Sequence, residues 1–279
     1  MFWIKHPSRL TMLAIALALG LVINVSAQAQ PRFSSFSNSI PTEWNFDPPP
    51  NTGTPVNREG GATRNPCIRE PNQELTLTAL VRKGTVGSTV SPYPSFSWYV
   101  PRTDAKKLRF VLKDANENPV YETEFALKDA SGGIASLHIP ASASVAPLQI
   151  GKEYEWELTT ICDPGDPAQN IPEDPTGNMV VKGWIKRVEL SPSLASQLER
   201  ATPEERLSLY ATNRLWYNTL ETLVQLRRMR PNDSRITDAW KKLLASVELN
   251  AIAQQPMFES STQAVERDRN SSASSLQLR

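Results

Sequence analysis

The sequence predicts a mainly β protein with a C-terminal α part. We expect a fibronectin III-like or immunoglobulin-like antiparallel β-sandwich, followed by a short tetratricopeptide-like helical hairpin and one further helix. Short runs of alternating apolar residues recur up to about residue 190, and the apolar period then changes to that of a helix. The chain also has 23 Pro against 12 Gly, which disfavours a long helical bundle.

The chain begins with the three parts of a secretory signal peptide. A basic start with Lys5 and Arg9 precedes an apolar run over 10–25, and an Ala-Gln-Ala triplet predicts cleavage after Ala29, so the signal peptide spans 1–29. An uncleaved anchor is the alternative, but the run is short for a bilayer core, which needs about 20 residues. We therefore expect a periplasmic or extracellular protein with no membrane span after cleavage.

The boundaries of the folded part follow from composition. Residues 30–59 form a Pro- and Ser-rich linker that we expect to be disordered, as we do the polar tail over 251–279. The sandwich is expected over 60–189 and a small helical domain over 190–250. Trp44 and Phe46 of the linker are expected to cover part of the neighbouring domain.

Seven strands are expected, each with one buried face. Their alternating runs lie at 75–81, 96–100, 108–112, 121–127, 135–139, 154–162 and 179–188, and only in the last run do the residues leave open which side faces inward. Two tryptophans, Trp98 and Trp156, should fill the space between the sheets. Tyr154 should form a tyrosine corner by hydrogen bonding to nearby backbone.

The helices are predicted from their start signals. Ser191-Pro192 is an N-cap followed by proline, Thr202 with Glu205 forms a capping box, and Asp233 or Ser234 caps the last helix. Residues 203–226 look like one tetratricopeptide-type hairpin. A single hairpin cannot bury its own apolar face, so it must pack on the sandwich, on the last helix or on a partner protein.

Cys67 and Cys162 are the only cysteines, and we expect them to form one disulfide in an oxidising compartment. A loop of this length would restrict the unfolded chain by about 4 to 5 kcal/mol. The alternative, a reactive thiol, would need neighbours that lower the thiol pKa, and none is evident.

Composition excludes several function classes. The chain carries 30 Lys+Arg against 29 Asp+Glu, which argues against a nucleic-acid binder. His138 is the only histidine left after cleavage, which excludes most zinc and iron chemistry, and it is expected on an outward strand face. No nucleotide-binding or common hydrolase motif is present. We expect no cofactor and no enzymatic activity.

Two acidic groups are weak candidates for chemistry. Glu153, Glu155 and Glu157 lie two apart on one strand face, a spacing that overlaps the separation of glycosidase carboxylates, although a solvated face explains them more simply. Asp163, Asp166 and Asp174 could bind calcium, but Asp-Pro-Gly is also ordinary turn chemistry.

The most favoured function is that of an adaptor that binds another envelope or secreted protein. The candidate contact residues are aromatic or cationic: Tyr99, Trp216, Tyr217, Arg227, Arg228 and Arg230. The three arginines close a helix, where cations meet the negative end of the helix dipole. A carbohydrate-binding module acting through an exposed aromatic such as Tyr99 is the alternative, and a glycan-acting hydrolase is the third possibility.

Several strings together resemble an uncharacterised cyanobacterial family, domain of unknown function 928. They are REGGATRNPC at 58–67, TALV at 78–81, YPSFSWYVP at 93–101, ICDP at 161–164, GWIKRV at 183–188 and LWYNTL at 215–220. The resemblance covers about 58–247 and includes both cysteines. It implies a cyanobacterial source and an envelope location, but the family has no assigned activity and so implies no mechanism.

Overall fold

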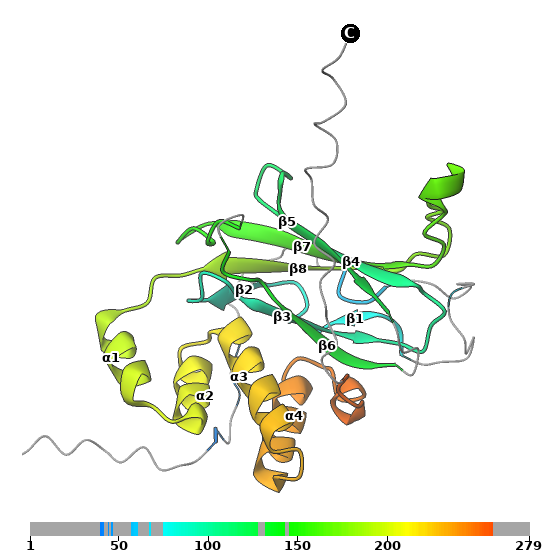
Figure 1. Cartoon of the computed structure of the whole chain (residues 1–279). Helices are drawn as coiled ribbons and strands as arrows, with labels where there is room; N and C mark the ends of the chain where they lie inside the picture. Colours follow the sequence, from blue (N-terminus) through cyan, green and yellow to red (C-terminus); the bar gives the residue numbers. More distant parts are fainter. Residues whose placement is uncertain are drawn as a thin grey trace, which may run out of the picture. The chain divides into compact units, whose positions relative to one another are not determined.

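The computed structural model describes residues 40, 41, 44, 46, 57–60, 67, 75–127, 132–142 and 145–258 (Figure 1). These residues belong to one unit that spans 37–279. The predicted signal peptide and most of the predicted linker and tail lie outside the described residues. Within the described ranges, no helix combines the length and the apolar character that crossing a membrane requires.

Eight strands of the described residues form two mostly antiparallel sheets. The larger sheet has the order β2-β8-β7-β4-β5, and the smaller has the order β1-β3-β6. The larger sheet contains β2 (Val86–Thr89), β4 (Lys107–Lys113), β5 (Pro119–Ala126), β7 (Glu153–Ile161) and β8 (Val180–Arg187). The smaller contains β1 (Thr78–Ala79), β3 (Ser95–Val100) and β6 (Gly133–His138).

The topology corrects the sequence prediction in two places. The sheets are not purely antiparallel, because β2 pairs with β8 in parallel. The sequence did not predict β2, since it is short and its run Val-Gly-Ser-Thr has no apolar alternation. The run at 75–81 forms a strand only at Thr78–Ala79, although its apolar residues are buried.

Aromatic side chains fill the space between the sheets, as predicted. Trp98 and Trp156 are both fully buried, and Phe110 on β4 stacks on each, with ring centroids 6.1 Å and 6.0 Å away. Tyr154 forms the predicted corner bond, in which its hydroxyl oxygen accepts from the Gln149 N–H at 3.0 Å. The alternating burial of β4 and β7 therefore directs one face of the larger sheet into this core.

Four helices follow the strands, and three begin at the caps that the sequence predicts. They are α1 (Pro192–Arg200), α2 (Pro203–Thr212), α3 (Trp216–Met229) and α4 (Ser234–Ala245). Ser191, Thr202 and Asp233 each accept a backbone N–H at a helix start, and Thr202 with Glu205 forms the full capping box. The N-cap residue of α3 is Leu215, which makes no side-chain capping hydrogen bond.

The helical hairpin packs on the β-sandwich. α3 contacts β2 of the larger sheet and β3 of the smaller sheet, so it packs on both sheets, and Figure 1 shows the helices below the strands. Tyr217 enters the core beside Phe96, with ring centroids 5.5 Å apart. Gly87 makes room for it, because a Cβ at that position would lie 2.6 Å from the Tyr217 ring. The apolar core is therefore continuous between strands and helices.

Segments from both ends of the described chain cover sheet edges. Residues 57–60 bond to β1 through the Arg58 C=O, which accepts from Ala79 N–H, and to β8 through the Asn57 C=O, which accepts from Lys182 N–H. Met257 bridges to Ile134 on β6. We expected a disordered tail from residue 251, but 251–258 contain a 3₁₀ helix, η2 (Ile252–Gln254), and the bridge from Met257. The bridge forms because the edge strand β6 offers backbone groups that can pair with it.

Candidate binding surfaces

The three aromatic residues predicted to contact a partner are buried, so this part of the prediction is wrong. Tyr99, Trp216 and Tyr217 are each no more than 3% exposed. Trp216 donates its indole N–H to the Leu80 C=O at 3.1 Å. Tyr99 was placed on an outward face by strand alternation, but both faces of β3 are covered because α3 packs on it. Trp216 and Tyr217 hold α3 to the strands.

The helix-to-sheet junction is also polar. The Asn218 side-chain oxygen on α3 accepts from the Thr89 hydroxyl and from the Val90 N–H, each at 3.0 Å. At the next turn of α3, the Glu221 carboxylate accepts from the Ser95 hydroxyl at 2.6 Å. Because these groups lie in or near the core, each bond satisfies a polar group that would otherwise lose its water partners.

The three candidate arginines at the end of α3 have different environments. Arg230 forms ion pairs with Glu204 and Asp233. Arg227 lies 4.9 Å above the centre of the Trp240 ring, and burial lowers its guanidinium pKa. Within the described ranges, neither Arg227 nor Arg228 has a carboxylate partner, and Nη1 of Arg227 is covered and has no hydrogen-bond acceptor. The adjacent Met229 is 64% exposed.

The acidic row on β7 belongs to a ladder of ion pairs on the outward face of the larger sheet. Lys182 binds Glu155 at 2.9 Å and Glu157 at 3.1 Å, and Lys186 binds Glu153 at 3.1 Å. The ladder continues through three further cations and two further carboxylates: Lys107, Arg109, Lys113, Glu124 and Glu173.

The ion-pair ladder shifts the pKa of Glu157 in the direction opposite to the one that a catalytic acid needs. Burial alone would raise the pKa of Glu157, but the hydrogen bond from Lys182 and the charges of Lys113 and Lys182 outweigh it and keep that pKa below its ordinary value. A glycosidase needs one carboxylic acid whose pKa is raised.

Asp163 and Asp174 are backbone partners across an isolated β-bridge, but the three candidate calcium ligands form no metal-binding group among the described residues. Each of Asp163, Asp166 and Asp174 accepts the backbone N–H two residues further on, from Gly165, Ala168 and Thr176, at 2.8 to 3.0 Å. In the described part of the chain, no group of three His, Cys, Asp or Glu side chains could hold a metal ion. The carboxylates stabilise their own turns, which is the ordinary turn chemistry of Asp.

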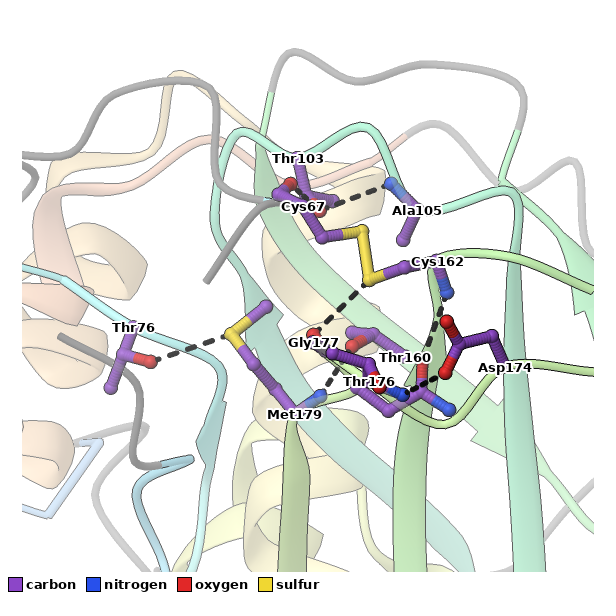
Figure 2. Close-up of a disulfide and its surroundings, with 11 residues drawn as sticks. Cys67, Thr76, Thr103, Ala105, Thr160, Cys162, Asp174, Thr176, Gly177 and Met179 are labelled. Carbon is purple, nitrogen blue, oxygen red and sulfur yellow. Dashed lines mark hydrogen bonds between the residues drawn. A yellow bond between two sulfur atoms is a disulfide. The ribbon is translucent and has the colours of Figure 1, made fainter. Parts of the chain in front are cut away.

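The predicted disulfide joins Cys67 to Cys162 at the end of β7, and Figure 2 shows it with its surroundings. The Cys67 C=O accepts from the Thr103 hydroxyl and from the Asp104 N–H, and the Cys162 N–H donates to the Asn178 side chain at 3.0 Å. The bridge therefore links residue 67 to both the loop that precedes β4 and the hairpin after β7.

One polar cluster was missed by the sequence analysis. Ser95 on β3, His138 on β6 and Glu221 on α3 meet at the helix-to-sheet junction, with the Ser95 hydroxyl 3.0 Å from Nδ1 of His138. It is not a catalytic triad, because the same ring nitrogen faces both the serine and the carboxylate, at 3.5 Å from the latter. Ser95 and Glu221 are 126 positions apart, so no local pattern could have indicated the cluster.

Trp184 is a second residue that the sequence analysis missed. It lies on the outward face of β8, directly opposite Glu155 on β7, and is partly exposed. The sequence did indicate that Trp184 faces outward. Lys182 and Lys186 lie two residues away on either side, and residues two apart share a strand face. Trp184 is thus a partly exposed aromatic residue on an outward sheet face, which is the environment that was expected for Tyr99.

These observations define a class of protein: a disulfide-linked protein of two β-sheets with a helical cover, whose solvent-facing groups are ion pairs, arginines and an aromatic ring. The chain belongs to the family described as Domain of Unknown Function (DUF928), which matches residues 59–257. This confirms the resemblance found in the sequence. No curated protein matches the chain.

Proposed function

We propose that the chain is an exported, non-enzymatic adaptor of the cell envelope, periplasmic or extracellular, that binds an acidic region of another protein with the C-terminal end of α3. Arg227, Arg228 and Met229 form this binding end. The proposal rests on the guanidinium groups of Arg227 and Arg228, which have no carboxylate partner among the described residues. Arginine and methionine are enriched in protein interfaces, and a partner's carboxylates would pair with the guanidinium groups bidentately.

The finer fold assignment supports the same function. We infer a fibronectin-like sandwich from the Tyr154 corner and the two buried tryptophans, and a tetratricopeptide-like hairpin from the packing of α2 on α3. Both architectures commonly serve as binding scaffolds, although an architecture alone does not establish a function. The hairpin uses its apolar face on the sandwich, so its outer end is the part that is free to bind.

The test uses the full chain with a photo-crosslinking residue in place of Met229. The protein that crosslinks in an envelope extract is identified and purified, and its affinity is measured for wild type, Arg228→Glu and Arg200→Glu. Arg200 is an exposed arginine on α1 and serves as the matched control. We expect Arg228→Glu to weaken binding at least tenfold and added salt to weaken the wild-type complex.

Two results would contradict this proposal. One is a crosslinked protein that binds wild type and Arg228→Glu equally well, and the other is an affinity that does not change with salt. Arg200→Glu should bind as wild type does.

A further inference from the structure

Trp184 occupies the centre of a small patch on the outward face of the larger sheet. Glu155 on β7 lies opposite it on one side, and Val86 on β2 lies opposite it on the other. Lys182 and Lys186 precede and follow it on the same face of β8. Adjacent strands are about 4.8 Å apart and same-face neighbours on one strand about 7 Å apart, so all four residues are immediate same-face neighbours of Trp184.

The part of Trp184 that solvent reaches is apolar. The side chain is partly exposed, whereas its indole nitrogen is covered and has no hydrogen-bond partner among the described residues. The exposed side-chain atoms are therefore carbon atoms. The principal helix contacts are with β2 and β3, and the helices lie on the opposite side of the molecule from this face (Figure 1).

The polar groups around the ring are charged but mutually compensated. Lys182 pairs with Glu155 and Glu157, Lys186 pairs with Glu153, and Lys113 also pairs with Glu157. A ladder with five cations and five carboxylates has no net charge to attract a polyanion, a polycation or a strongly charged protein surface. It nevertheless offers ammonium donors and carboxylate acceptors on either side of the ring.

We propose that this patch, the Trp184 patch, binds a neutral polysaccharide. One face of a hexopyranose ring carries mainly C–H groups and can pack on the indole carbons, while its hydroxyl groups both donate and accept. The carboxylates of Glu153 and Glu155 accept from those hydroxyls, and Lys182 and Lys186 donate to them. The ligand class follows from one apolar ring surrounded by donors and acceptors with no net charge.

The patch is separate from the protein-binding end of α3. It rests on residues of β7 and β8, whereas the proposed adaptor contact rests on Arg227, Arg228 and Met229. Either proposal can therefore fail without the other.

The experiment is affinity electrophoresis of the purified full chain in gels that contain dextran, laminarin, hydroxyethyl cellulose or galactomannan, with polygalacturonate as the charged comparison. We expect at least one neutral polysaccharide to retard wild type. Trp184→Ala should lose at least tenfold in affinity, Trp184→Phe should keep part of it, and Glu155→Gln should weaken it without removing the ring. Arg228→Glu is the matched control and should be retarded as wild type is.

The fold of each variant is checked by far-ultraviolet circular dichroism and by its thermal midpoint. Trp184 is on the outward face, so Trp184→Ala should keep the native far-ultraviolet spectrum, and Glu155→Gln tests the patch independently should that spectrum change. The proposal is overturned by a wild-type protein that no neutral polysaccharide retards, by retardation in polygalacturonate alone, or by equal retardation of wild type, Trp184→Ala and Glu155→Gln.

Discussion

The hydroxyl of Tyr217 joins three elements of the fold. It accepts from the Trp156 indole N–H on β7 at 2.8 Å and donates to the Trp184 C=O on β8 at 2.9 Å, while its own backbone belongs to α3. Burial raises the pKa of this hydroxyl, so it stays neutral and able to donate. Tyr217 was expected to contact another protein, but its hydroxyl instead forms hydrogen bonds inside the core.

Removing this hydroxyl should be costly. Tyr217→Phe keeps the ring but removes the acceptor of the buried Trp156 indole N–H, so we expect the free energy of unfolding to fall by about 1 to 3 kcal/mol. Urea unfolding measures it. Tyr210→Phe, a half-buried tyrosine on α2, is the control and should change stability by less than about 1 kcal/mol. Equal midpoints for the two variants would show that the hydroxyl contributes nothing.

Residue-level predictions succeeded where they depended on neighbours in sequence. The caps at Ser191, Thr202 and Asp233 are local patterns, and Trp98 and Trp156 follow from strand alternation. Predictions that depended on exposure failed, because exposure depends on what packs on an element. Tyr99 has the alternation of an outward residue, but it is buried, and the distant α3 packs on its strand.

Among the elements, β4, β7 and β8 combine two functions that their alternation predicts. Their inward residues form the core, and their outward residues form the ion-pair ladder. The strand β2 was missed because its parallel partner β8 lies almost a hundred residues further on, a pairing that no local pattern encodes. The ladder could not be predicted either, since its ion pairs depend on the register between strands.

The ladder should make stability depend on pH. The folded state holds the pKa of Glu157 below its ordinary value of 4.5, so this carboxylate stabilises the fold above about pH 4.5 and loses that contribution as the pH falls through the lower folded-state pKa. Glu157→Gln should lower the free energy of unfolding by roughly 1 kcal/mol at pH 7, since partly exposed ion pairs contribute little.

The measurement is urea unfolding of both proteins at several values between pH 7 and pH 3. The difference between wild type and Glu157→Gln should shrink as the pH falls, because both then carry a neutral group at position 157. A difference that stays constant or grows toward pH 3 would contradict this assignment of the ion pairs.

At the scale of the whole molecule, the sequence separates strands from helices correctly near residue 190, but it does not show that they share one core. A small satellite cluster beneath α1 and α2 contains Leu194, Leu198, Leu209 and Leu215, whereas α3 packs on the strands and α4 packs on α3. The core is continuous because Tyr217 enters between the sheets, and no pattern in the sequence predicts that position.

The disulfide should contribute to the stability of the whole unit. The bond closes a loop of 95 positions, so the double variant Cys67→Ser, Cys162→Ser should lose about 4 kcal/mol of unfolding free energy. Urea unfolding with and without a reducing agent measures the loss. Reduced wild type should match the double variant, and the double variant should not respond to the reducing agent. A urea midpoint of the double variant and of reduced wild type equal to that of oxidised wild type would show that the disulfide does not restrict the unfolded chain.

The junction between α3 and the strands also determines when the protein can fold. Its hydrogen bonds join residues 126 to 136 positions apart, so the strands cannot reach their final packing until most of the chain has been synthesised. High contact order of this kind slows folding to milliseconds or longer. For an exported chain, as proposed, the junction can form only after α3 has crossed the membrane as well as the strands.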